Sequence, residues 1–373
     1  MHKTEMIFLI FLFFPTCLCF SYVGTTSMVF LEDEIGARPF GMGQAFTAIA
    51  NDANLLQINP GGLDYIIFPE VNITYNKGLM DLYDTYFGYI QPLGNYGTIG
   101  TSLYIYDGGL IDINYPDGSQ KLLKAEQDWV LTAGYGYHIG EEFCFGLNTK
   151  FISSILAEAY SAWTLAFDVG GIYRTLDDRI SIALVIQNMG FPLKYKSADC
   201  FLPSSLKAGF AWKIIETERD NLLLTSDLIY SFNNIIRCNI GGEYELWKVL
   251  ALRVGYKIGY NPDVICFGAG YKYPFNQGVI AVDYGLQIIG DMSINHRVSL
   301  SYQFGSNEFV EKGERYRNKA MPKRAINMFE KIKKEDVFYD IAQEKIKSIR
   351  EEEQRKSENS KIQIVNYLKN GHF

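Results

Sequence analysis

The sequence predicts an all-β fold: a transmembrane antiparallel β-barrel of about fourteen strands, with an N-terminal hatch and a C-terminal periplasmic α-helical extension. Three observations predict it. Apolar and polar side chains alternate with a period of two from residue 70 to residue 304. Most alternating runs hold 8–13 residues, and a tilted strand needs about 9–11 residues to cross a bilayer. The gaps between the runs are long on one side and short on the other, as in membrane barrels.

The chain begins with the features of a secretory signal peptide. His2 and Lys3 precede an apolar run at 7–14. This run is shorter than the roughly 20 residues that a membrane-spanning helix needs. We therefore expect residues 1–21 to be removed on export. No second long apolar run follows residue 25, which argues against a helical membrane protein.

The segment 22–69 is expected to form a hatch that folds into the barrel. A lumen enclosed by about fourteen strands is too wide for the side chains of the wall to fill, and an open lumen would leak. A segment that precedes the first strand is well placed to close it. Within this segment we expect a short helix at 44–50 and a turn at 59–62, where Asn-Pro-Gly-Gly leads the chain into the wall.

The segment 70–305 is expected to form the barrel wall. In 250–258, for example, Leu250, Leu252 and Val254 share one face, while Ala251 and Arg253 share the other. A soluble β-sandwich or propeller would show the same alternation, so the period alone leaves both architectures open. The fourteen runs lie near 70–77, 83–91, 97–106, 128–139, 143–154, 162–174, 179–188, 204–214, 221–231, 236–246, 250–258, 264–273, 278–288 and 295–304.

Three further features favour the membrane barrel. Aromatic residues gather near the ends of the apolar stripes, as two interfacial girdles require. The polar face carries many glycines and charges of both signs, which a lumen tolerates. The two longest gaps, 107–127 and 189–203, fall on one side of the wall. Because the number of strands is even, both termini are expected on the periplasmic side of a bacterial outer membrane.

The sequence GARPFGMGQAFTAIANDANLLQINPGGL (36–63) resembles the N-terminal motif of the FadL-like superfamily of outer-membrane barrels. It is most similar to the PorV/PorQ-like branch, which includes spirochaetal barrels, and VIQNMG (185–190) resembles a strand-end motif of that branch. The resemblance implies a 14-stranded barrel with its hatch in the lumen. Gly61 stands where many members have alanine. The positions that we take as a structural and gating motif are Gly36, Arg38, Gly41, Gly43, Asp52, Asn59, Pro60, Gly61 and Gly62.

The resemblance implies one of two functions. In the first, the barrel mediates uptake or passage of hydrophobic small molecules, such as a fatty acid, past a gating hatch. Gly-rich stretches at 134–136 and 168–171 could bend the wall for such a passage. In the second, the chain is a barrel subunit of a type IX-like protein secretion or cell-surface attachment system. Its partners are outer-membrane lipid in both cases, and secreted or periplasmic proteins in the second.

The segment 306–373 is expected to be a charged helical tail in the periplasm. It holds 16 Lys or Arg against 12 Asp or Glu, whereas the rest of the chain is acidic. Its apolar residues have helical spacing around 325–332 and 338–349. Two interpretations stay open: a solvated extension, and a docking arm for a periplasmic or peptidoglycan-associated partner.

No catalytic, metal or cofactor site is predicted, and the chain is not expected to be an enzyme. The histidines form no cluster, and the four cysteines after residue 21 lack the spacing of a metal site or a disulfide framework. Carboxylates on the lumen face, such as Asp168, Asp227 and Asp283, are expected to pair with Arg or Lys rather than to catalyse hydrolysis. Basic residues form no stripe that would bind nucleic acid.

Overall fold

The computed structural model describes residues 26–78, 82–114, 118–140, 142–175, 179–196, 198–217, 219–232, 235–275, 278–290, 293–305, 308–318, 321–332, 334 and 339–369. The predicted signal peptide, residues 1–21, lies outside these residues, as do residues 22–25 of the predicted hatch.

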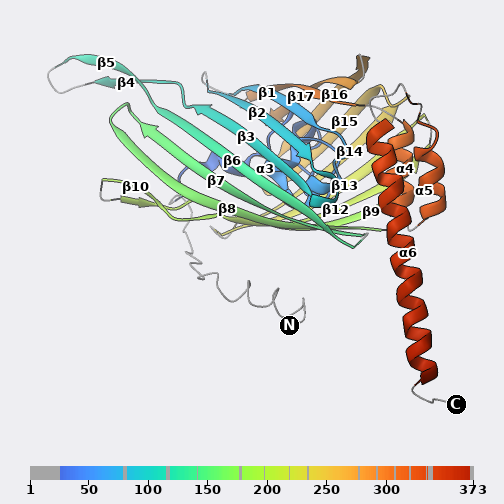
Figure 1. The fold of residues 1–373 in the computed structure, drawn as a ribbon. Coiled ribbons are helices and arrows are strands. Elements are labelled where there is room, and N and C mark those ends of the chain that lie inside the picture. The colour runs from blue at the N-terminus through green and yellow to red at the C-terminus, as the bar shows by residue number, and fades with distance from the viewer. Residues whose placement is uncertain are drawn as a thin grey trace.

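Fourteen strands close into one antiparallel barrel, which confirms the predicted fold class. Figure 1 shows the strands tilted across the wall. The ring closes where the first strand pairs with the last, with Glu70 opposite Gln303 and Lys77 opposite His296. The barrel strands are β1 Glu70–Lys77, β2 Tyr83–Pro92, β3 Thr98–Asp107, β6 Glu126–Ile139, β7 Phe143–Leu156, β8 Tyr160–Arg174, β9 Ile180–Gly190, β12 Ser205–Glu216, β13 Asn221–Ser231, β14 Ile235–Leu246, β15 Leu250–Ile258, β16 Val264–Phe275, β17 Gly278–Ile289 and β18 Ser293–Gln303.

The apolar face of the wall points outward. Leu131 and Leu252 expose 52% and 65% of their surface, and Trp129 exposes 53%. The polar partners on the same strands are buried on the inner side, for example Thr132 at 0% and Arg253 at 5%. In water this arrangement would leave a continuous apolar belt exposed, whereas in a bilayer the belt meets lipid.

The two long connections both form strand hairpins rather than irregular loops. One holds β4 Leu110–Asn114 and β5 Gln120–Lys124, and the other holds β10 Leu193–Tyr195 and β11 Ala198–Cys200. Figure 1 shows both at the end of the barrel away from the C-terminal helices. We call these two ends the hairpin end and the helical end.

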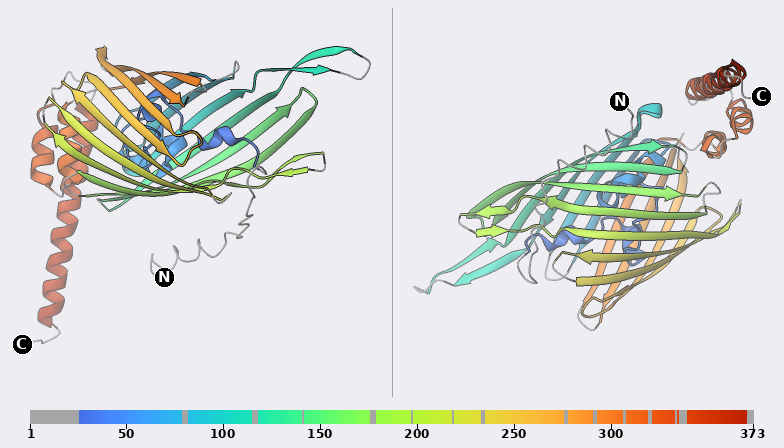
Figure 2. Two further views of the ribbon diagram at one scale, coloured as in Figure 1. Left: turned by 180° about the vertical axis from the view of Figure 1, so that it is seen from behind. Right: turned by 90° about the horizontal axis from the view of Figure 1, so that it is seen from below.

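Residues 26–69, here called the plug segment, lie inside the barrel, as both views in Figure 2 show. Their elements are η1 Val29–Glu32, α2 Ala37–Gly41, α3 Leu55–Ile58 and η2 Pro60–Tyr65. Plug side chains such as Met42, Phe46, Leu55 and Leu56 are completely buried and form one apolar core with wall residues. The lumen is therefore filled by the chain's own N-terminal segment.

The helix predicted at 44–50 is wrong; the plug segment is irregular there, and the helix lies earlier, in α2. The reason is that side chains of the wall satisfy its backbone groups. Asp227 accepts hydrogen bonds from the amides of Phe46 and Thr47, each at 2.9 Å, and Thr225 donates to the carbonyl of Ala45 at 2.6 Å. A backbone that finds such partners in the wall gains little from forming helical bonds.

The tail folds into three helices at the helical end: α4 Glu308–Asn318, α5 Pro322–Phe329 and α6 Tyr339–Lys369. Phe329, Ala342 and Ile349 are buried in a small core that also includes Phe68, at the end of the plug segment. This core ties the start of α6 to the barrel, and Figure 1 shows the rest of α6 extending away from it. No helix in the described part of the chain is long and apolar enough to cross a membrane.

Replacing Ile349 with valine should destabilise this tail core by about 0.5–1.5 kcal/mol, because a buried methylene is lost. Ile349 is 3% exposed. Ile341, on the same helix, is 43% exposed, and its replacement by valine is the matched control with an expected change near zero. Hydrogen exchange of the α6 amides measures both, and equal protection in the two variants would contradict the burial of Ile349.

Candidate functional site: the plug segment and its anchors in the wall

Glycines of the plug segment meet glycines of the wall, so that two backbones touch. A Cβ atom added to Gly41 would lie 2.7 Å from the Cα of Gly268 in β16. A Cβ on Gly61 would lie 2.7 Å from the Cα of Gly171 in β8. Real Cβ atoms do not approach so closely, so only glycine fits at these positions. The many glycines on the lumen face are therefore explained by close approach of the plug segment.

Arg38 is the centre of a buried ion-pair network that joins the plug segment to β14. Its Nε and Nη2 bind the two carboxylate oxygens of Glu243 at 2.7 and 2.5 Å. Its Nη1 donates to Asp52 at 2.9 Å and to Asn51 at 2.7 Å. The Arg38 and Glu243 side chains are only 7% and 3% exposed. The two-pronged geometry is the strongest that an arginine can make with a carboxylate.

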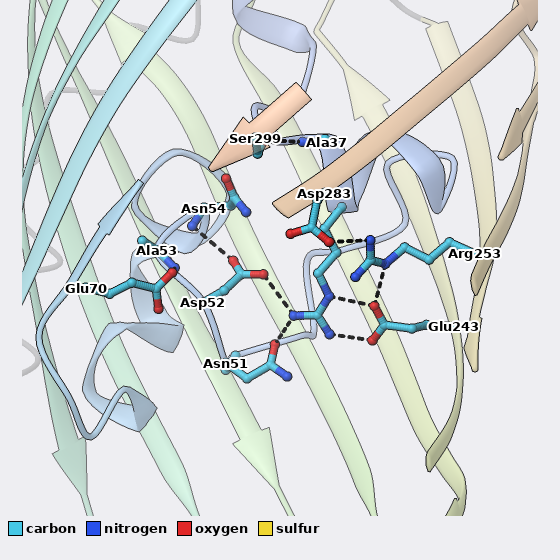
Figure 3. A network of polar contacts seen from close by, with 12 residues as sticks. Ala37, Asn51, Asp52, Ala53, Asn54, Glu70, Glu243, Arg253, Asp283 and Ser299 are labelled. Carbon is cyan, nitrogen blue, oxygen red and sulfur yellow. Dashed lines mark hydrogen bonds and ion pairs between the residues drawn. The ribbon is translucent and has the colours of Figure 1, made fainter. Parts of the chain in front are cut away.

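The network continues along the wall (Figure 3). Arg253 of β15 donates to the same Glu243 at 2.6 Å and to Asp283 of β17 at 2.6 Å. A continuous series of ion pairs thus joins the plug segment to the strands β14, β15 and β17. Burial alone would lower the pKa of Arg38, but the Glu243 and Asp52 carboxylates hold it above its usual value, so Arg38 stays charged.

A second ion pair lies nearer the hairpin end. Lys207 of β12 binds Glu34 of the plug segment at 3.1 Å, and both side chains are at most 3% exposed. Burial raises the pKa of Glu34 to about 7, against the opposing attraction of Lys207. Arg297 of β18 donates to the carbonyl of Glu34. Glu34 therefore lies between cations from two distant parts of the wall.

Asn59 fixes the turn that leads the plug segment toward the wall. It is fully buried, its side-chain oxygen accepts from the amide of Gly61 at 3.0 Å, and its amide nitrogen donates to the carbonyl of Thr47 at 3.0 Å. Pro60 then begins the helical turn η2, where its missing N–H costs nothing. Gly62 lies against the side chain of Leu55.

Replacing Asn59 with alanine should cost about 1–3 kcal/mol, because two buried backbone groups lose their partners. Asn59→Ser is the comparison variant: its hydroxyl can still accept from the amide of Gly61, as in a serine turn, and only the donor to Thr47 is lost. Hydrogen exchange of amides in 45–62 measures the loss, and we expect less protection in the alanine variant than in the serine variant. Unchanged protection in both would show that the turn does not depend on Asn59.

The VIQNMG segment forms a further anchor. Gln187 of β9 donates to the carbonyls of Gln57 and Ile58 at 2.8 Å each. Asn188 follows with a φ of 55°, and the pairing of β8 with β9 shifts register at this point. The extra residue makes a β-bulge. Of the two stretches expected to bend the wall, 168–171 adjoins this bulge, whereas 134–136 keeps a continuous register.

A buried ion pair between Lys150 and Asp168 stabilises the β-bulge at Asn188. Lys150 of β7 lies 2.8 Å from Asp168 of β8 and donates to Asn188 at 2.8 Å. Asp168 accepts from the amide of Asn188 at 2.8 Å. Asp168 and Asp283 thus pair with a lysine and an arginine, as expected from the sequence. Asp227 does not follow that expectation, since it binds backbone amides of the plug segment.

The structure divides the nine motif residues between two sides of the barrel. Gly36, Arg38, Gly41 and Gly43 lie in and around α2, against the strands β14–β18, and Arg38 brings Asp52 to this group. Residues 59–62 lie against β6–β8. The strands β16 and β7 are seven places apart in the ring of fourteen. The motif therefore spans the lumen, and Glu243, the wall partner of Arg38, could be found only from the strand register.

The described residues contain no group of three or more His, Cys, Asp or Glu side chains that could hold a metal ion. The described geometry is that of a filled and cross-linked lumen.

Comparison with solved structures finds similar barrels, at identities that establish the fold alone. The Pseudomonas putida toluene transporter TodX gives a TM-score of 0.53 at 14% identity, over 74% of this chain and 98% of that one. The Ralstonia pickettii toluene transporter TbuX gives 0.51 at 12%, over 74% and 100%. A Pseudomonas aeruginosa FadL homologue gives 0.50 at 12%, over 72% and 98%. This chain thus has the fold of these FadL-like β-barrels, and its lumen holds its own N-terminal segment.

Residues 21–230, more than half of the chain, match the family model for the type IX secretion system protein PorV. The chain belongs to the PorV family, as the resemblance of its hatch motif indicated. A sequence search among curated proteins finds no match.

Proposed function

We propose that this barrel mediates the passage of small hydrophobic molecules across the outer membrane, and that the plug segment gates it. The proposal rests on one observation, an apolar layer inside the barrel at the hairpin end. The layer is formed by the plug segment, five wall strands and the β10 hairpin. Its residues are Met28, Phe30, Leu31, Ile35, Tyr86, Tyr104, Val130, Ile152, Leu156, Ala162, Ala166, Leu193, Tyr195, Cys200 and Leu202.

The layer supports a hydrophobic cargo because it is apolar, whereas other parts of the inner wall carry buried polar and charged side chains such as Thr132, Glu243 and Arg253. A pore for ions or sugars gains nothing from apolar side chains in its lumen, whereas a hydrophobic molecule is bound by them. The solved barrels TodX and TbuX are toluene transporters by description, which agrees with such a cargo. The nine motif residues would then act as the gate, since they join the plug segment to opposite sides of the wall.

Binding of the neutral fluorophore N-phenyl-1-naphthylamine to the full chain in lipid nanodiscs tests the proposal. Ile152 lies in the layer and is fully buried, and Ile155 lies outward on the same strand at 38% exposure. Ile152→Thr should weaken binding about fivefold, because about 1 kcal/mol of apolar contact is lost. Ile155→Thr should leave it unchanged. Absence of saturable binding to the wild-type chain would refute a hydrophobic cargo.

The proposal includes an orientation and a processing step. The helical end, with the tail, faces the periplasm, the hairpin end faces outward, and residues 1–21 are removed on export. Protease added to intact cells should then cut the β4–β5 hairpin and spare α6. N-terminal sequencing of the mature protein should begin near residue 22. Cleavage of α6 in intact cells would reverse the orientation.

A second function is favoured by the family match and by the tail. A barrel subunit of a type IX-like secretion system, or of a surface attachment system, needs a closed lumen and surfaces for partners. The cross-linked plug segment and the projecting α6 suit both needs. Deleting the gene separates the two functions: trapped secretory proteins in the periplasm support the secretion role, whereas lost uptake of a hydrophobic solute with normal secretion supports the transport role.

A further inference from the structure

The carboxyl group of Asp128 is buried in the hairpin-end apolar layer without a partner. Asp128 lies near the start of β6, on the lumen face, and is 0% exposed. Among the described residues, neither of its carboxyl oxygens has a hydrogen-bond partner. Val130, two residues along the same face, belongs to the apolar layer itself. A polar group in such a place is costly unless something satisfies it.

The groups around Asp128 are aromatic rings, a hydroxyl and a second carboxyl. In the strand register Tyr106 faces it from β3 and Ser154 from β7. The Ser154 hydroxyl also has no hydrogen-bond partner among the described residues. Glu126 lies two residues before Asp128 on the same face of β6 and brings a second carboxyl group to it. The site is therefore acidic.

Two further rings close the site. Tyr195 comes from the β10 hairpin and is within electrostatic reach of Asp128. Phe30 of the plug segment stacks on Tyr106, with ring centroids 4.4 Å apart and planes 7° apart. Ring faces beside a carboxylate are the combination that recognises an organic ammonium group.

Among the described residues, no Lys or Arg side chain pairs with Asp128. Lys124, at the base of the neighbouring hairpin, is bound to Asp107 at 2.9 Å. A metal ion does not fit well either, because calcium takes six to eight oxygen ligands, and the described residues bring no third carboxylate to this place.

We propose that Asp128 binds the ammonium group of an amphiphilic organic cation, whose apolar body lies in the hairpin-end apolar layer. This inference rests on the proposed passage of hydrophobic molecules and names their chemical class. A fatty acid carboxylate would meet Asp128 and Glu126 as like charges, so the site selects against anionic amphiphiles. A neutral molecule would leave Asp128 without a partner.

Binding of three probes of equal chain length tests the inference: octylammonium, octan-1-ol and octanoate, each titrated against the full chain in uncharged nanodiscs. We expect the ammonium probe to bind about 10–100 times more tightly than octan-1-ol, since a charged partner adds about 1.5–3 kcal/mol. Octanoate should bind most weakly. Asp128→Asn should bring the ammonium probe to the affinity of octan-1-ol. Asp263→Asn, an exposed carboxylate in the β15–β16 connection, is the control and should change nothing.

The outcomes separate this inference from the function on which it rests. If octan-1-ol binds and the ammonium probe binds no more tightly, the hydrophobic cargo stands, Asp128 carries a proton, and the inference is wrong. If the ammonium preference is equal in the wild type and the Asp128→Asn variant, Asp128 is not its source. If none of the probes binds, the proposed function fails together with the inference. The comparison of the three probes uses only the wild-type chain, so it does not depend on whether a variant folds.

Discussion

Replacing Arg38 with alanine should loosen the plug segment by about 3–5 kcal/mol, the usual cost of removing one partner of a buried ion pair. Arg38 is the only residue of the plug segment that, among the described contacts, reaches Glu243. Without it, one side of Glu243 and the Asp52 carboxylate lose their cation inside the lumen. Hydrogen exchange of amides in 36–54 should speed up by about two to four orders of magnitude, the rate equivalent of that energy.

The control for Arg38 is an exposed arginine. Arg350 in α6 pairs with Glu330 at 3.2 Å, and both side chains are more than half exposed. Arg350→Ala should change protection by less than about 1 kcal/mol. A double-mutant cycle of Arg38→Met and Glu243→Gln should show strong coupling, because the two side chains touch. If Arg38→Ala left the exchange of the plug amides unchanged, the network would not hold the plug segment.

Replacing Gly241 with alanine should displace the plug segment from the wall while the barrel stays folded. A Cβ atom on Gly241 would overlap the carbonyl oxygen of Met42, a backbone atom that has no rotamer to change. Overpacking of this kind costs about 1–3 kcal/mol and sometimes more, and rigid backbone on both sides favours the upper end. We expect a measurable single-channel conductance in planar bilayers, where the wild-type barrel should be closed.

The next residue supplies the control for Gly241. Gly242 points to the other face of β14, and its nearest neighbour would be a methyl group of Leu224 at 3.3 Å. Gly242→Ala should therefore fold normally and stay closed. A difference in gel mobility between unheated and heated samples shows whether the barrel is intact in each variant. Equal conductance in the two variants would mean that contact of the plug segment with β14 does not seal the lumen.

Local sequence was enough to predict the wall. The period-two alternation depends only on which face meets lipid, so strands such as 250–258 were placed within a residue or two of their observed bounds. The conformation of the plug segment was harder to predict from local sequence. Its helix was misplaced because the amides of Phe46 and Thr47 bind Asp227, which lies about 180 residues away in the sequence. The secondary-structure propensity of the local sequence carries no information about a partner so distant along the chain.

For the candidate site, too, the sequence predicts some of the residues and only the structure shows the others. Arg38 and Asp52 are part of a recognisable motif, but Glu243, the wall partner of Arg38, lies on a strand that carries two carboxylates on one face, Glu243 and Glu245. Which of them meets Arg38 depends on the strand register and on the depth of the plug segment. The unpartnered state of Asp128 likewise becomes visible only when three strands and a hairpin lie side by side.

The hydrogen bond from the amide of Ala37 to Ser299, at 2.7 Å, has a consequence for how the protein is made. It joins residues 262 positions apart, so the earliest part of the plug segment reaches its place only when the last strand arrives. Contacts of such long sequence separation form late and slowly. Ring closure and the last contacts of the plug segment therefore both wait for β18, the final strand of the barrel.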